Sequence, residues 1–222
     1  MAKNRSECFF GLHFDFHAMT GDEVGSVIDI ASIEEMLDAT KPDMIQVDTK
    51  GHPGISSYMT AAGVHADVMH MDVLRTWREL TKKRGIRLYA HHSGLYEETQ
   101  AARHPDWASR NAEGNAYGGY VSAFSPYVDE VLLPQLREIA GEYGVDGAWI
   151  DGDEWGAFVD YSPYARAAWK KETGSDTPPM PGDAGYDAYV EFCREGFRRY
   201  VDHYVTTIKA EFPDFEITSN WM

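Results

Sequence analysis

Five short apolar segments recur along the 222-residue sequence, and segments with helical spacing of apolar residues separate them. The apolar segments end in polar or ionisable side chains, and the longest loops follow those ends. The expected strands are residues 9–17, 44–50, 86–90, 147–151 and 215–221. Strands that alternate with helices in this way pair in parallel through right-handed crossovers. The order of elements therefore predicts an α/β fold with a parallel sheet.

An open doubly wound sheet and a (β/α)8 barrel both begin with this order. The polar strand ends favour the barrel, because its active site is built from the loops that follow the strands. The sequence has no GxGxxG motif after the first strand and no Walker A motif, which removes the usual reason to prefer a nucleotide-binding sheet. A complete barrel needs ~250 residues. We therefore expect a TIM barrel of which only the first five β/α units are present, as a single catalytic domain over residues 1–222 that is truncated at its C-terminus.

Capping and stop signals predict where the helices lie. The first begins at the capping-box spacing of Ser32 to Glu35, and Pro134 should kink or restart the third. Residues 95–124 are expected to form a long loop over a cleft. The expected helices cover residues 32–41, 72–85, 128–143, 162–174 and 186–211.

A formal net charge of −16 and a sequence pI near 4.8 argue against a nucleic acid or an anionic membrane surface as partner, because the protein would repel both. Cys8 and Cys193 are too few and too far apart for a disulfide scaffold, so we expect free thiols. The N-terminus lacks the apolar region of a signal peptide, and no apolar run approaches the ~20 residues that span a bilayer. A soluble, cytoplasmic protein is expected, and association into a homo-oligomer is left open.

Three carboxylates follow the fourth predicted strand within four positions: Asp151, Asp153 and Glu154. Asp151 stands at the carboxyl end of the strand and is expected to face substrate. A rigid strand end would hold this carboxylate in place, and neighbouring His or Lys side chains would keep it ionised. A solvated acidic loop is the alternative interpretation of the three carboxylates.

Polar side chains also end the first two strands. His13, Asp15 and His17 stand at alternate positions and therefore share one side of the first strand. They could bind substrate hydroxyls, hold a divalent metal as an HxDxH motif, or form structural hydrogen bonds. Asp48 and Lys50 at the end of the second strand are interpreted either as an ion pair or as direct substrate contacts.

His91 and His92 follow the third strand and would point to opposite faces, so at most one of them should reach the site. Among the aromatic residues, Trp149 is interpreted as core, because it precedes an apolar residue on its strand. Trp155 and Trp221 at strand ends are better placed to stack on the apolar face of a substrate, with packing at the edge of the core as the alternative.

The segment Tyr143 to Gly152 resembles the helix-then-strand segment of the α-L-fucosidase family of glycoside hydrolases, whose strand ends in Trp-Phe-Asp-Gly. Thr49-Lys50-Gly51-His52-Pro53-Gly54 is similar to that family's Thr-Lys-His-His-Asp-Gly, with His52 kept and two positions changed. After Phe10-Gly11-Leu12 the chain continues His-Phe-Asp-Phe-His where the family has His-Trp-Gly, and His91-His92 replaces the usual tyrosines. The resemblance implies a (β/α)8 barrel with Asp151 as nucleophile. The departures fall on residues that would contact the sugar.

These features together predict a retaining glycoside hydrolase that cleaves an O-glycosidic bond. Retaining enzymes need a nucleophile and an acid whose carboxyl groups lie about 5 to 5.5 Å apart. Asp151 would be the nucleophile, and Glu154 is the nearby acid candidate unless a later strand supplies the acid. This interpretation expects no cofactor and no metal. The residues expected to bind an oligosaccharide or glycoside substrate are His13, Asp15, His17, Asp48, Lys50, His52, His91, His92, Asp153, Trp155, Asn220 and Trp221.

Two alternatives stay open at this point. A metal-dependent hydrolase or lyase would use His13, Asp15, His17 and one of His91 or His92. A non-catalytic carbohydrate-binding barrel fragment would bind a sugar without turning it over.

Overall fold

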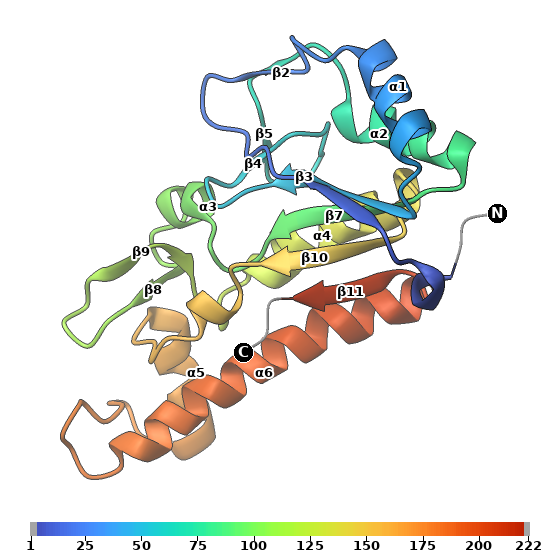
Figure 1. The fold of residues 1–222 in the computed structure, drawn as a ribbon. Coiled ribbons are helices and arrows are strands. Elements are labelled where there is room, and N and C mark those ends of the chain that lie inside the picture. Colours follow the sequence, from blue (N-terminus) through green and yellow to red (C-terminus); the bar gives the residue numbers. More distant parts are fainter. Residues whose placement is uncertain (1–3, 220–222) are drawn as a thin grey trace.

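The computed structural model describes residues 4–219, and a sheet of parallel strands lies at its centre (Figure 1). The parallel order is β1 (Gly11–Phe14), β3 (Met44–Lys50), β7 (Arg87–Ser93), β10 (Gly147–Asp151) and β11 (Glu216–Ser219). β4 (Ile55–Ser56) pairs with β3 in the antiparallel direction and with β5 (Val64–His65) in the parallel direction. The pairings within residues 4–219 leave β1 and β11 as the outer strands of the parallel series, so the described chain is a mixed α/β fold with an open sheet.

The strands match the predicted positions, with differences at their ends. β3 and β10 have the predicted bounds. β1 is shorter than the predicted 9–17 at both ends, and at its start the Asp43 carboxylate accepts hydrogen bonds from the backbone N–H groups of Phe9 and Phe10. β7 is longer than predicted and includes His91 and His92, so these side chains have the fixed directions of strand residues.

Four helices lie close to their predicted positions: α1 (Ile30–Thr40), α2 (Val73–Arg84), α5 (Pro163–Thr173) and α6 (Tyr186–Glu211). The predicted start of α1 at a capping box was wrong. Asp29 is its N-cap, and the Asp29 side chain accepts hydrogen bonds from the Ala31 N–H and the Ser32 hydroxyl. Gly85 ends α2 as predicted, with a φ of 66° in the left-handed region that glycine tolerates best.

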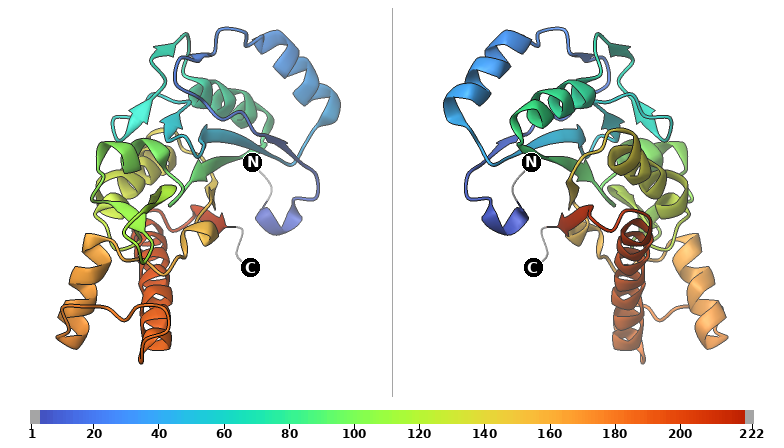
Figure 2. Two further views of the ribbon diagram at one scale, coloured as in Figure 1. Left: turned by 90° about the vertical axis from the view of Figure 1, so that its left-hand side faces the viewer. Right: turned by 90° about the vertical axis from the view of Figure 1, so that its right-hand side faces the viewer.

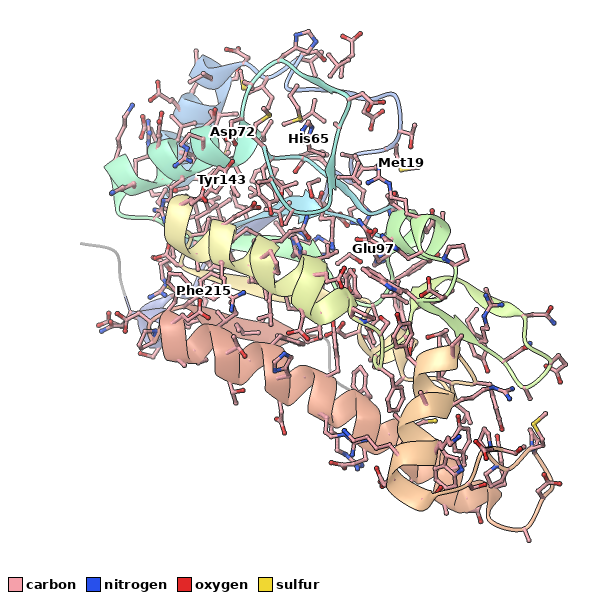
Figure 3. All side chains as sticks on the ribbon, turned by 180° about the vertical axis from the view of Figure 1, so that it is seen from behind. Met19, His65, Asp72, Glu97, Tyr143 and Phe215 are labelled. Atoms are coloured by element: carbon pink, nitrogen blue, oxygen red, sulfur yellow. The ribbon has the colours of Figure 1, made fainter. Side chains whose placement is uncertain are left out.

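The segment 128–142 contains the predicted restart at Pro134. A π-helical turn, η2 (Val128–Leu132), leads into α4 (Leu133–Arg137), and a second π-helical turn, η3 (Glu138–Glu142), follows. Proline has no N–H and its ring crowds the preceding turn, so the wider π-helical turns beside Pro134 relieve this crowding. Tyr143 follows this segment, and its hydroxyl donates to Asp72 Oδ2 at 2.7 Å (Figure 3). Asp72 is the N-cap of α2, so this hydrogen bond ties the end of the segment to α2.

Residues 95–124 are not the single long loop that the sequence predicted. They contain α3 (Glu98–Arg103) and an antiparallel hairpin of β8 (Ala108–Arg110) and β9 (Ala116–Val121). These elements are short, and two adjacent glycines lie inside β9. Such segments show no clear periodicity of apolar residues, so the sequence pattern did not indicate them. The remaining short elements are η1 (Arg5–Glu7), β2 (Glu23–Val24), β6 (Val68–Met69) and η4 (Glu154–Gly156).

Helices cover one face of the sheet, as the end-on views show for α2, α4 and α6 (Figure 2). The main core lies between the two layers, where Leu88 and Ile150 of the strands are buried with Leu136 and Tyr204 of the helices. None of the helices within residues 4–219 is long and apolar enough to cross a lipid bilayer.

The opposite face of the sheet is hollow. His13, Gln46, Tyr89, Trp149 and Thr218 line a cavity of about 560 Å³ on this face. Successive side chains of a strand point to opposite faces, so the residues that alternate with the core residues are directed into this hollow. His13 and Trp149 of this lining also contact His91, near the carboxyl end of β7.

Candidate active site

Three neighbouring strands bring imidazole and carboxylate groups together at their carboxyl ends. Asp48 lies on β3, His91 on β7 and Asp151 at the last position of β10. His91 Nε2 is 3.2 Å from Asp151 Oδ2, and His91 Nδ1 is 3.6 Å from Asp48 Oδ1. Asp48 and His91 are register partners in the parallel ladder, which places their side chains side by side. The imidazole of His91 therefore lies between two carboxylates from the strands on either side.

The chain beyond β1 adds two more groups to this cluster. His17 Nε2 lies 2.9 Å from Asp15 Oδ1 and 3.6 Å from Asp48 Oδ1, and His91 Nδ1 lies 3.6 Å from Asp15 Oδ1. His17 packs on Gly51, where a Cβ atom would be only 2.3 Å from the imidazole Cγ. The absence of a side chain at Gly51 makes room for His17.

The three residues of the HxDxH motif do not form one group of ligands. His13 lies edge-on to His91, with ring centroids 5.1 Å apart, and Asp48 instead of His13 is the fourth member of the group. Asp15, His17, Asp48 and His91 each offer one ligand atom, and these four atoms lie within 4.8 Å of one another. This group has the donor chemistry to hold a divalent metal ion.

Trp149 is not the core residue that the sequence predicted. It is half-buried on the hollow face of the sheet, where its ring stacks on His91 at 4.8 Å and meets His13 edge-on at 5.8 Å. The prediction was wrong because a residue next to buried Ile150 must point to the other face of the strand. Partial burial and the charge of His91 lower the pKa of His13.

His52 approaches Asp151 from the opposite side of the cluster. His52 Nε2 is 3.4 Å from Asp151 Oδ2, and His52 Nδ1 is 2.9 Å from Ser93 Oγ. The ring stacks on Tyr96 at 4.4 Å and meets Trp155, which is 46% exposed, edge-on at 5.7 Å. Ser93 and Tyr96 were not among the site residues expected from the sequence. Ser93 continues the polar end of its strand, which was a usable signal, whereas no pattern marked Tyr96.

Asp151 is electrostatically suited to remain a carboxylate. Burial raises its pKa, but the hydrogen bond and charge of His91, the charge of His52 and the Gly152 N–H lower it, and the net result is a pKa below the ordinary value. The group is therefore ionised at neutral pH and presents a negative charge at the end of β10.

The pKa of Asp48 is shifted in the opposite direction to that of Asp151. Burial, followed by the charges of Asp15 and Asp151, raises its pKa well above the ordinary value, and Lys50 offsets this only in part. The expected ion pair between Asp48 and Lys50 does not form as a direct contact. Lys50 Nζ lies instead 2.9 Å from Glu97 Oε2, in the protein interior.

Lys50 and His92 are directed away from the cluster and do not line it, contrary to the expectation that they contact sugar. A register shift between Asp48 and Lys50 turns Lys50 to the same side of the sheet as His92, its partner in the ladder. His92 is fully buried, and its two ring nitrogens lie 3.0 Å from Thr49 Oγ1 and 3.1 Å from Gln135 Oε1. As predicted, His91 alone of the two adjacent histidines reaches the cluster.

Asp153 also lies in the interior, although it was expected to bind substrate. It accepts hydrogen bonds of 3.0 Å from the Leu95 N–H and from the hydroxyls of Tyr200 and Tyr204. Burial raises its pKa to about 7, against the effect of these donors. Asp153 therefore connects the loop after β10 to α6.

Glu154 follows in η4 and is half-buried. Burial and the charge of Asp151 raise its pKa, as an acid catalyst would require. The other two expected sugar contacts, Asn220 and Trp221, lie outside the described residues.

The sequence model of the Alpha-L-fucosidase family matches residues 45–179, which is more than half of the chain. The chain belongs to the alpha-L-fucosidase family. The matched range includes Asp48, His52, His91 and Asp151 of the cluster. Asp15 and His17 precede it.

Solved structures share the fold. Alpha-L-fucosidase isoenzyme 2 from Paenibacillus thiaminolyticus superposes with a TM-score of 0.80 at 20% identity, over 96% of this chain and 32% of that one. Alpha-N-acetylgalactosaminidase NagBb from Bifidobacterium bifidum has a TM-score of 0.52 at 12% identity, over 95% of this chain and 35% of that one. This chain thus spans about a third of the length of either enzyme.

A hypothetical protein from Ruminiclostridium thermocellum ATCC 27405 has a TM-score of 0.59 at 11% identity, over 94% of this chain and 96% of that one. The fold therefore also occurs in a chain of nearly this length. No curated protein matches the sequence.

Proposed function

We propose that this chain carries the nucleophile of a retaining glycoside hydrolase, with Asp151 in that role. The observation that carries the proposal is the position of Asp151 at the end of β10, between His91 and His52, where its pKa is lowered. A retaining enzyme needs an ionised carboxylate held rigidly beside the anomeric carbon. Membership of the alpha-L-fucosidase family supports the same reaction class.

In the proposed reaction, Asp151 attacks the anomeric carbon and forms a glycosyl-enzyme bond while the leaving oxygen receives a proton. Water then releases the sugar and regenerates the carboxylate. His52 and His91 keep Asp151 ionised and oriented. Exposed Trp155, beside His52, offers an aromatic face on which the apolar side of a sugar ring can stack.

Glu154 is the acid candidate among the described residues. Its raised pKa favours the protonated form that must donate to the leaving oxygen. An acid from a segment outside residues 1–222 would replace Glu154 in this role, as it would in a barrel completed by later strands. Activity that survives in Glu154→Gln would exclude Glu154 as the acid.

We also propose that the open sheet is part of a (β/α)8 barrel. The five parallel strands described within residues 4–219 present polar side chains to a hollow, as the inner face of a barrel does. The Paenibacillus fucosidase, with the same fold over this region, is about three times as long.

Hydrolysis of aryl glycosides by the protein and by Asp151→Asn tests the proposed function. The panel begins with aryl α-L-fucosides and includes N-acetyl-α-galactosaminides, because structural relatives carry both names. Loss of the nucleophile should lower kcat by about 10⁴-fold or more. The matched control is Asp176→Asn, since Asp176 is an exposed carboxylate paired with Lys170. Equal rates for Asp151→Asn and the parent protein would refute the assignment.

The same experiment separates the non-catalytic alternative. A carbohydrate-binding fragment would be stabilised thermally by a sugar that it does not hydrolyse. It would also bind that sugar as well with Asn at position 151 as with Asp.

A further inference from the structure

Four ligand atoms converge beside Asp151 from three separate parts of the chain. They are Asp15 Oδ1 and His17 Nε2 from the segment after β1, Asp48 Oδ1 from β3 and His91 Nδ1 from β7. Among these atoms one pair is 2.9 Å apart and three pairs are 3.6 Å apart, and all four atoms lie within 4.8 Å of one another. A tetrahedral ion with bonds of about 2.0 to 2.2 Å places its ligand atoms about 3.4 Å apart. The three separations of 3.6 Å are close to this value.

The buried members of this group lack hydrogen-bond partners. Within residues 4–219, both carboxylate oxygens of Asp48, Nε2 of His17 and Nδ1 of His91 are buried and form no hydrogen bond. The Asp48 side chain is only 2% exposed. A buried carboxylate without a donor costs several kcal/mol, so such a group needs a cation or a proton.

Within residues 4–219, Asp15 and Asp48 form ion pairs with His17 and His91, whose imidazoles are charged only when protonated. Lys50, the nearby cation of the second strand, is directed to Glu97 on the other side of the sheet. The carboxylates therefore converge in a place that attracts positive charge.

Gly51 and His17 fit together at the edge of this cluster. The His17 ring occupies the space above Gly51, where a Cβ would collide with it. The glycine therefore admits the imidazole that the segment after β1 brings.

We propose that Asp15, His17, Asp48 and His91 form a binding site for a divalent first-row transition ion, with Zn²⁺ as the best match. Two imidazole nitrogens and two carboxylate oxygens suit Zn²⁺, whereas Ca²⁺ and Mg²⁺ prefer all-oxygen sites. His91 is already oriented for this role. With its proton on Nε2, it donates to Asp151 and leaves the Nδ1 lone pair for the ion, as metal-bound histidines commonly do.

The first test is titration of the chelator-treated protein with Zn²⁺ by calorimetry and with Co²⁺ by visible absorption. One ion per chain is expected, with the intense Co²⁺ bands of a four-coordinate site. His17→Ala removes a direct ligand and Asp48→Asn replaces a charged ligand with a neutral amide, so each should weaken Zn²⁺ binding by at least ~10-fold. His17 follows β1 and is half-buried, so His17→Ala should fold even where Asp48→Asn does not.

His70→Ala is the matched control, because His70 forms an exposed pair with Glu23 away from the cluster. It should leave Zn²⁺ affinity unchanged. Absence of stoichiometric binding, or equal affinity in the parent protein and His17→Ala, would overturn the site. Both readouts are independent of turnover. If the protein binds Zn²⁺ in this way but hydrolyses no glycoside, the metal site stands and the proposed function is refuted. If it hydrolyses a glycoside but binds no Zn²⁺, the proposed function stands and the metal site is refuted.

Discussion

His91 contacts Asp151 across two neighbouring parallel strands, with Nε2 3.2 Å from Oδ2, while its ring stacks on Trp149. The stacking fixes the plane of the imidazole, and the contact with Asp151 fixes which nitrogen carries the proton. One histidine thus holds the proposed nucleophile on one side and directs its other nitrogen to Asp48 and Asp15.

His52 should act as a positioning residue for Asp151. His52→Ala removes a charged contact of 3.4 Å to the carboxylate and should lower kcat/KM by roughly 10- to 100-fold, as expected when a reacting group loses its positioning contact. The measurement uses the best aryl glycoside of the panel. His203→Ala is the control, because His203 pairs with Asp129 at the surface. Unchanged kinetics in His52→Ala would remove it from the site.

Gly51→Ala should weaken Zn²⁺ binding without removing any ligand. The added Cβ would lie 2.3 Å from His17 Cγ, so the imidazole must move out of the cluster. We expect a loss of affinity of at least ~10-fold in calorimetry, similar to His17→Ala. Gly141→Ala is the control, since Gly141 is exposed and its added Cβ would lie no closer than 3.2 Å to its nearest neighbour, the Phe212 ring. Parent-like affinity in Gly51→Ala would contradict the coupling between Gly51 and His17.

The buried Lys50–Glu97 ion pair should matter for stability, not for substrate contact. Both side chains are at most 1% exposed, and Lys50 also donates to the Tyr127 hydroxyl at 2.8 Å. Removal of one partner leaves an uncompensated buried charge, so Lys50→Met should lower the free energy of unfolding by about 3 to 5 kcal/mol in urea titrations. The double variant Lys50→Met with Glu97→Leu should recover part of that loss. A double variant that loses as much as the sum of the two single variants would show that the pair is not coupled.

Asp153 should make stability depend on pH. Its pKa is raised from 3.8 to about 7 in the folded protein, so the folded state holds a proton that the unfolded state releases between these values. Stability from this group is complete below pH 4 and is lost as pH rises towards 7, by roughly 4 kcal/mol at 1.36 kcal/mol for each pH unit.

Asp153→Asn cannot titrate at this position. The difference in unfolding free energy between the parent protein and Asp153→Asn, measured by urea titration from pH 4 to 8, should therefore fall with pH and level off above 7. A difference that is constant or rises with pH would mean that the carboxyl is ionised throughout this range.

Much of the fold was predictable because its signals are local. β3, β10 and α6 are long enough, or apolar enough, for periodicity to place them, and Ser162 and Gly174 mark the ends of α5 by capping chemistry. α3 and the β8–β9 hairpin were missed, because short elements depend on tertiary contacts that no local pattern records. The predicted proximity of the polar strand ends was confirmed for Asp48, His91 and Asp151.

The side-chain directions were harder to predict than the strand positions. Regular alternation would place Asp48 and Lys50 on one face, but the register shift between them separates the two. Asp153 follows the strand, where the backbone no longer alternates, and its direction depends on Tyr200 and Tyr204 of a helix about fifty residues away in sequence. Long-range partners of this kind are not visible in one sequence.

Covalent trapping tests the central claim most directly. A 2-deoxy-2-fluoro glycoside of the sugar that the protein hydrolyses should form a glycosyl-enzyme that turns over slowly, because fluorine destabilises the oxocarbenium-like transition state. Intact mass measurement followed by peptide mapping identifies the labelled residue. We predict a single label on Asp151 and none in Asp151→Asn. Hydrolysis with the label on another residue, or unchanged labelling of Asp151→Asn, would contradict the assignment of Asp151 as the nucleophile.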